Sequence, residues 1–313
     1  MLKTFINSVQ NLPVIIFAFF LLTGFTSESF GQISKENVKS LKSVKVNGVK
    51  LHYIEAGKGT PVIFVHGGLE DYRAWESQIK PFSEKYKVIA YSRRYNFPND
   101  NSSIRSDHSA IVEAEDLAAM IKKLKLKPAH IVSHSYGAFT ALFLAVKHPE
   151  MIRTLVLSEP PVLGLSAEKT EGKVLYDEFM KNIWNPAGNA FNKNENEQAL
   201  RLTVKYFAGA DVYNEVPETV REFWKVNSKE WQALTTSTNA FPVLPREDIK
   251  KIKAPVLMLS GENTLSILKF VDNELQPLFL KSERVIFKKA SHDMWSEQPE
   301  TVGKAVLSFL AKY

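Results

Sequence analysis

The stretch Ile131-Val132-Ser133-His134-Ser135-Tyr136-Gly137-Ala138-Phe139 predicts a short apolar strand, a tight polar turn and the start of a helix, with Ser135 at the tip. That arrangement is typical of a nucleophile elbow, in which a serine side chain projects from a strained strand-to-helix turn. The N–H of the next residue is then free to stabilise a negatively charged oxygen. The usual pattern is G-x-S-x-G, and Ser133 stands in place of the first glycine. Because such pentapeptides also occur by chance in loops, the remaining chain must supply the partners that Ser135 needs.

The composition of the chain is that of an ordinary globular protein. Its 313 residues are 44% hydrophobic and 24% charged, with a net charge of +6. Basic and acidic residues are interleaved, which favours a solvated basic surface over a nucleic-acid patch. The absence of cysteine excludes disulfides, thiolate metal sites and a cysteine nucleophile. No histidine or carboxylate cluster has metal-ligand spacing, so we expect neither a metal nor an organic cofactor.

Residues 1–31 have the pattern of a cleaved export signal. Lys3 is followed by an apolar run that begins at Val14, and the small residues Ser29 and Gly31 stand before Gln32. A membrane helix needs about 20 apolar residues, and this run is shorter, although an uncleaved anchor is the alternative. We therefore expect a signal peptide at 1–31, a polar linker at 32–42 and a periplasmic or extracellular protein without stable membrane insertion after cleavage. The absence of cysteine suits an oxidising compartment.

Strands alternate with helices along most of the remaining sequence. An alternating apolar pattern around Asn47-Gly48 predicts a β-hairpin, and continuous apolar runs predict buried strands of a parallel sheet. Helices are expected where apolar residues recur every three or four positions. Besides the hairpin and the run that leads into Ser135, the expected strands are 61–65, 87–91, 153–157, 255–259 and 284–287, and the expected helices are 72–86, 107–125, 139–147 and 299–312.

This order predicts an α/β protein with a mostly parallel sheet covered by helices on both faces. From 162 to about 245 no strand is evident, while charged and aromatic residues are dense. We therefore expect a first part of the core at 43–161, a helical cap at 162–245 and a second part of the core at 246–313. Sites in such sheets form at the carboxyl ends of strands. Four predicted strand ends carry residues suited to chemistry: His66-Gly67-Gly68, Ser135, Glu159 and His292.

These pieces together resemble the α/β-hydrolase superfamily, in its single-domain capped form, over about residues 44–313. The resemblance implies an eight-stranded sheet with the cap inserted after strand 6. It implies that Ser135 is the nucleophile and that His292, in the loop after the last strand, is the base that a serine hydroxyl needs. The backbone N–H groups of Gly68 and Tyr136 would then form the oxyanion hole.

The acid partner of His292 is where the sequence departs from the commoner family pattern. Many relatives carry an aspartate in a G-E-x-D stretch after strand 7, and this chain has Thr264 at that position. A threonine cannot stabilise an imidazolium by charge. Glu159, at the end of strand 6, is the expected replacement and keeps the family order of nucleophile, acid and base. Glu262, or no carboxylate at all, is the alternative, and Asp293 is expected to stabilise its loop.

Three further features are expected to be mainly structural. His66 and His134 flank the oxyanion hole, and we expect them to position loops rather than to transfer protons. The family's D-x-R-G-x-G stretch is replaced by Ser92-Arg93-Arg94-Tyr95-Asn96, whose arginines are expected in salt bridges rather than on an anionic substrate. The cap is rich in aromatic residues, most of which would pack the cap itself. Two or three of them would line an apolar pocket that excludes water.

The resemblance implies an exported serine hydrolase that acts through an acyl-enzyme on a small apolar or aromatic carboxylic ester or lactone. A serine nucleophile argues against the dehalogenase and epoxide-hydrolase branches, which use aspartate. Hydrolysis of amides, thioesters or carbon–carbon bonds and cofactor-free peroxidation need the same residues and are alternatives. Two others are an inactive binding protein, motivated by Thr264, and a membrane-tethered scaffold. The expected partner is a small-molecule substrate and not a nucleic acid, and the composition is silent on oligomeric state.

Overall fold

The computed structural model describes residues 41–101 and 103–313. The expected signal peptide at 1–31 and most of the expected linker at 32–42 lie outside the described residues. Within the described part of the chain, no helix has the length and apolar character that a membrane crossing needs.

Eight strands form one sheet in the order β1-β2-β4-β3-β5-β6-β7-β8. The first two strands pair antiparallel through a turn at Asn47 and Gly48, β2 pairs antiparallel with β4, and all other neighbours are parallel. Asn47 and Gly48 have φ of 44° and 78°, as a tight hairpin turn requires. The predicted fold class, with a mostly parallel eight-stranded sheet, is confirmed. The strands are β1 (Lys42–Val46), β2 (Val49–Ala56), β3 (Pro61–Val65), β4 (Lys87–Tyr91), β5 (Ala129–His134), β6 (Ile152–Ser158), β7 (Val256–Gly261) and β8 (Ser282–Phe287).

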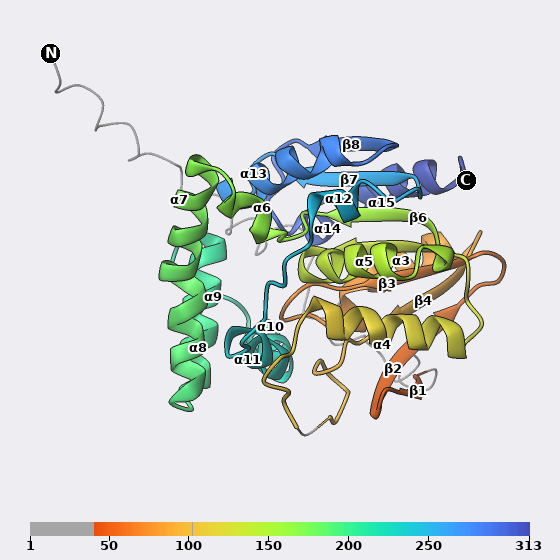
Figure 1. Ribbon diagram of the computed structural model, residues 1–313. Coiled ribbons are helices and arrows are strands. Elements are labelled where there is room, and N and C mark those ends of the chain that lie inside the picture. Colours follow the sequence, from red (N-terminus) through yellow and green to blue (C-terminus); the bar gives the residue numbers. More distant parts are fainter. Residues whose placement is uncertain (1–40, 102) are drawn as a thin grey trace, which may run out of the picture.

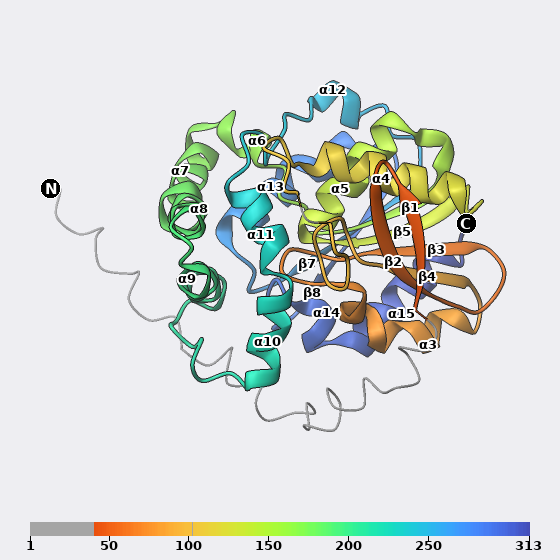
Figure 2. The same cartoon turned by 90° about the horizontal axis from the view of Figure 1, so that it is seen from below.

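Helices cover both faces of the sheet (Figure 2). On one face α4 (Ala110–Lys123) and α5 (Ser135–Lys147) pack against one set of strand residues. On the other face α3 (Glu76–Ser83) and α15 (Pro299–Leu310) pack against the alternate set. Successive residues of β3 show this alternation, since Ile63 belongs to the first core and Phe64 to the second. The strands are continuously apolar because both faces are buried.

The segment between β6 and β7 is helical, and its helices α7 to α11 stand at one end of the sheet (Figure 1). We call helices α6 to α11 the cap. The expected insertion after strand 6 is therefore present, while the exact cap bounds 162–245 stay a prediction. The helices are α6 (Leu163–Ala167), α7 (Thr170–Phe179), α8 (Asn185–Asn192), α9 (Asn196–Ala208), α10 (Glu218–Val226) and α11 (Ser228–Thr235), followed by the short α12 (Arg246–Ile249) on the return to the core.

The structure differs from the sequence prediction between β7 and β8, where α13 (Ser266–Leu275) forms and no helix is expected. Its residues Ile267, Val271 and Leu275 recur every four positions and are buried, so a helical signal was available. The expected helix at 72–86 is also shorter, because a 3₁₀ turn at Tyr72–Trp75 precedes α3. A one-turn helix, α14 (Met294–Glu297), follows the loop that carries His292.

Candidate active site

Ser135 lies at the junction of β5 and α5 in a left-handed backbone conformation, with φ of 51°. A non-glycine residue in that region is strained, and such strain concentrates at functional sites. The turn brings the first turn of α5 against the end of β3. A Cβ on Gly137 would lie 2.3 Å from the carbonyl oxygen of His66, so only glycine fits there. The elbow that the sequence predicts is therefore present.

Ser133 occupies the position of the first glycine in the usual elbow pattern, and its side chain has a hydrogen-bond partner there. The buried Ser133 hydroxyl donates a hydrogen bond to the carbonyl oxygen of Val156 at 2.6 Å. Val156 lies on β6, the parallel neighbour of β5. The serine thus replaces a small residue without leaving a buried polar group unpaired.

Glu159 and His292 are in direct contact, although 133 residues separate them in sequence. His292 Nδ1 lies 2.6 Å from Glu159 Oε2, and the Glu159 side chain is wholly buried. The carboxylate also accepts hydrogen bonds from Gly261 N–H at 2.7 Å and from the Thr264 hydroxyl at 2.6 Å. These donors compensate for its burial. Since the carboxylate accepts from Nδ1, Nε2 of neutral His292 carries the free lone pair, and His292 lines the same cavities as Ser135.

The other carboxylates near the site make different contacts. Glu262 is exposed and accepts a hydrogen bond from the N–H of Lys289 at 2.8 Å. The carbonyl oxygen of Asp293 accepts from the N–H groups of Ser296 and Glu297, which is how this residue begins α14. Thr264 bonds Glu159 and not the imidazole, so the side chain at the commoner acid position supports the carboxylate that reaches His292.

Gly68 and Tyr136, the expected oxyanion donors, each line a cavity that Ser135 also lines. Gly68 lines the cavity that holds Ser135, and a Cβ there would come within 2.9 Å of Cζ3 of Trp231 on α11. Tyr136 is in the first turn of α5, where backbone N–H groups lack helical partners. Both N–H groups are thus available at the strand ends where the sequence places them.

His66 is buried and neutral. Its Nε2 accepts a hydrogen bond from the N–H of Arg93 at 3.0 Å, so the proton is on Nδ1, which donates to the carbonyl oxygen of Gly67 at 2.8 Å. Burial and the neighbouring Arg93 cation lower the pKa of His66 to about 4. His66 therefore positions the loop, in the way that the sequence analysis expects.

His134 joins the elbow to the loop that carries His292. Its Nε2 lies 3.0 Å from the carbonyl oxygen of His292, and its Nδ1 lies 3.4 Å from Glu70 Oε2. Both partners accept hydrogen bonds, so both ring nitrogens must carry protons. Burial alone would lower the pKa of His134, but the Glu70 carboxylate raises it to about 9. An imidazolium thus packs beside His292, with 4.7 Å between ring centroids.

Glu70 is a site residue that the sequence analysis misses. Its Oε2 accepts a hydrogen bond from Gly67 N–H at 2.6 Å and faces the His134 cation. Burial alone would raise the pKa of Glu70, but His134 lowers it to about 2. A carboxylate so close after the predicted glycine turn was the available signal.

The Glu70–His134 pair predicts a stability that depends on pH. The pKa of His134 is higher in the folded chain than the value of about 6.5 of an unfolded histidine, so its contribution is complete below about pH 6.5 and is lost as the pH rises through 9. We expect the free energy of unfolding to fall by about 1–3 kcal/mol more in wild type than in His134→Gln between pH 6.5 and 9.5. Urea titrations across this range measure the difference, and parallel curves for the two proteins would contradict the assignment.

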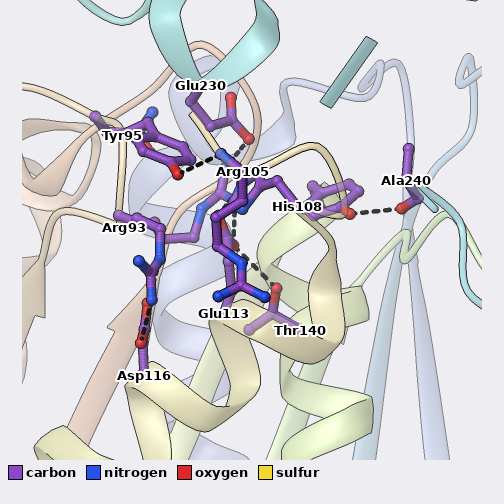
Figure 3. Close-up of polar contacts among 12 residues, drawn as sticks. Arg93, Tyr95, Arg105, His108, Glu113, Asp116, Thr140, Glu230 and Ala240 are labelled. Atoms are coloured by element: carbon purple, nitrogen blue, oxygen red, sulfur yellow. Dashed lines mark hydrogen bonds and ion pairs between the residues drawn. The ribbon is translucent and has the colours of Figure 1, made fainter. Parts of the chain in front are cut away.

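The two arginines that follow β4 form the expected salt bridges. Arg94 pairs with Asp116 through two hydrogen bonds of 2.8 Å, and Arg93 contacts Glu113 and Glu230 (Figure 3). All these side chains are buried. Neither arginine lines the cavities at Ser135.

Two cavities meet at Ser135 and His292. The larger, of about 130 Å³, has a mixed lining of charged and aromatic side chains, and the smaller, of about 30 Å³, is almost entirely apolar. The cap aromatics that the sequence leaves unassigned can now be placed. Phe207, Trp224 and Trp231 line the larger cavity, and Phe179, Trp184, Phe207, Trp231 and Phe241 line the smaller. Among residues 41–101 and 103–313, no group of three or more histidines and carboxylates is arranged to hold a metal ion.

Comparison with known proteins agrees with this fold. The family model described as the alpha/beta hydrolase fold matches residues 60–299, which include every strand end discussed above. The chain belongs to the α/β-hydrolase family. The predicted superfamily, and with it the broad prediction of a hydrolase, is confirmed.

This α/β hydrolase is similar to relatives with different named activities. Human epoxide hydrolase 4 is 23% identical over 284 residues, which cover 85% of this chain and 77% of that protein. Carboxylesterase YbfK of Bacillus subtilis (strain 168) is 26% identical over 273 residues, which cover 83% of this chain and 84% of that protein. The structure of Est816, described as an N-acyl homoserine lactone degrading enzyme, matches 86% of this chain and 100% of its own with a TM-score of 0.68 and 22% identity. That structural likeness shows the fold alone.

Proposed function

We propose that this α/β hydrolase cleaves a small apolar or aromatic carboxylic ester or lactone through an acyl-enzyme on Ser135. The observation that carries the proposal is the contact of 2.6 Å between Glu159 Oε2 and His292 Nδ1, beside a serine held at positive φ. A serine, a histidine and a buried carboxylate in this order are the parts of a nucleophilic triad.

In the proposed reaction the Ser135 hydroxyl attacks the substrate carbonyl, and His292 Nε2 accepts its proton. Glu159 holds the proton on Nδ1 and stabilises the imidazolium. The N–H groups of Gly68 and Tyr136 donate to the oxyanion of the tetrahedral intermediate. When the intermediate collapses, the ester C–O bond breaks, the proton passes from His292 to the leaving alcohol, and Ser135 keeps the acyl group. Water, activated by His292, then releases the acid and restores the serine.

The substrate class follows from the cavities and from the nucleophile. The smaller cavity is lined by aromatic and aliphatic side chains of the cap and of α13, which suits an apolar group. One relative is named a carboxylesterase and one similar structure is described as a lactone-degrading enzyme. Relatives named epoxide hydrolases do not redirect the proposal, because Ser135 stands where that branch is expected to use aspartate.

A fluorophosphonate probe tests the proposal directly. Such a probe phosphonylates an activated serine and leaves an ordinary hydroxyl unmodified, so wild type should be labelled at Ser135 and heat-denatured protein should not. A panel of phenyl and alkyl esters, lactones, amides and thioesters then identifies the bond. Absence of labelling in folded wild type would exclude the serine-hydrolase mechanism and leave the alternative of an inactive binding protein.

We also propose export, with cleavage before Gln32. The support is the basic start, apolar run and small residues of the first 31 positions. N-terminal sequencing of the protein from an expressing bacterium is the test: Gln32 as the first residue supports export, and an intact start would favour the anchored alternative.

A further inference from the structure

The peptide group between Gly67 and Gly68 is held from its carbonyl side. The carbonyl oxygen of Gly67 accepts hydrogen bonds from Arg93 Nη2 and from His66 Nδ1, both at 2.8 Å. A trans peptide is planar, with its C=O and N–H pointing in opposite directions. Fixing the Gly67 oxygen therefore aims the Gly68 N–H away from Arg93, on the side where Gly68 lines the cavity of Ser135. Among the described residues, that N–H makes no hydrogen bond.

The two glycines do not hold this orientation by themselves. Glycine accepts positive and negative φ about equally, so a Gly–Gly peptide can turn over at little steric cost. The orientation must come from the groups that bind the peptide. His66, which donates to the Gly67 oxygen, belongs to the same loop, whereas Arg93 follows β4 and binds that oxygen from outside the loop.

Arg93 is in turn held by the cap. Its guanidinium is wholly buried, and its Nη2 is shared between the Gly67 oxygen and Oε1 of Glu230 on α11, at 2.7 Å (Figure 3). The other oxygen of Glu230 accepts a hydrogen bond from the N–H of Leu69 at 3.4 Å. The buried carboxylate of Glu230 therefore binds both Arg93, which holds the Gly67 oxygen, and Leu69, which follows Gly68.

Glu113 of α4 binds the other side of the guanidinium, and its carboxylate also accepts from the Thr140 hydroxyl at 3.2 Å. A buried cation with two carboxylates is sensitive to the loss of either, because the remaining charges rearrange to stay paired. Without Glu230, the guanidinium would be drawn toward Glu113 alone. The hydrogen bond to the Gly67 oxygen would then lose its geometry.

We propose that Arg93 and Glu230 are positioning residues that orient the Gly67–Gly68 peptide, so that the docked cap completes the oxyanion hole. This inference rests on the proposed serine-hydrolase function. Helix α11 then does more than line the substrate cavity, because the Gly68 N–H is oriented for catalysis only while Glu230 binds Arg93. Catalysis is thereby tied to the closed arrangement of cap and core.

Asn227 provides a matched control for cap docking as such. It also joins the cap to the core, since its Nδ2 donates to Asp71 Oδ2 at 2.7 Å and its Oδ1 accepts from the N–H of Phe97 at 2.9 Å. Like Glu230, it is wholly buried, and none of its side-chain hydrogen bonds involves Gly67 or Gly68. Loss of Asn227 weakens the same interface without touching the oxyanion peptide.

The deciding experiment compares Glu230→Gln with Asn227→Ala, using an ester that wild type hydrolyses. Glutamine has one acceptor oxygen, so it cannot serve Arg93 and Leu69 together. With active sites counted by fluorophosphonate titration, we expect Glu230→Gln to lower kcat by about tenfold or more while KM changes less than about threefold. Inhibition by phenylboronic acid, whose serine adduct places an oxygen in the oxyanion hole, should weaken by a similar factor. Asn227→Ala should lower Tm and keep kcat within about twofold.

Equal kcat and boronate inhibition in Glu230→Gln and wild type would overturn the inference, as would equal losses of kcat in the two variants. If Glu230→Gln does not fold, Glu230→Asp decides the matter by the same criteria, because it keeps the charge and withdraws the carboxylate by one methylene. Failure of the underlying function has a different signature: wild type itself would then resist the fluorophosphonate probe.

Discussion

Ser135→Ala should lower kcat by about 10⁴–10⁶ for any ester that the wild-type chain hydrolyses, with little change in KM. The loss is this large because the acyl-enzyme route is removed entirely, while the cavities that bind the substrate stay intact. Alanine keeps the backbone turn, so the protein should remain folded. Steady-state kinetics measure kcat and KM, and mass spectrometry should show that the variant forms no fluorophosphonate adduct.

Ser135→Gly is the informative partner of this variant. Both substitutions remove the hydroxyl, but glycine accepts the φ of 51° without strain and alanine does not. We expect equal loss of activity and a free energy of unfolding about 1 kcal/mol higher for the glycine variant. Retention of more than a few per cent of activity in both would place the nucleophile on another residue.

Glu159→Gln should lower kcat by about 10³–10⁴. Gly261 N–H must donate to the remaining side-chain oxygen, so the new amide NH₂ group faces Thr264 and His292. An NH₂ group donates, and it therefore forces His292 to carry its proton on Nε2, where the lone pair for Ser135 is needed. The imidazolium also loses its counter-charge. Glutamine nearly matches glutamate in shape, so the change tests chemistry rather than packing.

Two variants serve as controls for Glu159. Thr264→Val removes one of the hydrogen bonds to the carboxylate and keeps the volume, so we expect a loss of about tenfold or less. Glu262→Gln changes an exposed carboxylate that binds the N–H of Lys289, and it should leave kcat within about twofold. A large loss in Glu262→Gln together with an active Glu159→Gln would transfer the acid role to Glu262.

The strands and the elbow could be predicted because their signals are local. β4 occupies the residues 87–91 that the apolar run indicates, and β3 the residues 61–65. The helix α13 is missing from the prediction because it directly follows Gly261-Glu262-Asn263-Thr264, a stretch typical of a loop. Its apolar spacing is nonetheless regular. A local signal for this helix was therefore present in the sequence.

Some residues of the site could likewise be predicted from the sequence and others could not. Ser135, Glu159 and His292 each end or follow a strand, so topology brings them to one edge of the sheet and the sequence suffices to place them. Glu230 and Trp231 escape because their partners, Leu69 and Gly68, are set by tertiary packing. Glu230 meets Leu69 across 161 residues, and neither residue is unusual in its local sequence. Contacts between an inserted cap and a core loop produce no periodic pattern in the sequence from which they could be predicted.

The position of Glu159 has a consequence for how members of this family diverge and can be recombined. The residue stands directly between the last strand before the cap and the Pro160-Pro161 pair that leads into α6. The entry of the cap is therefore under chemical constraint, whereas its exit near residue 245 carries no triad residue. A cap transplanted from a relative should be joined after Pro161, because a junction before Glu159 would exchange the acid along with the cap. In relatives that carry the acid at the end of the strand before the cap, insertions and deletions are thus expected to accumulate at the exit of the cap and to be rare at its entry.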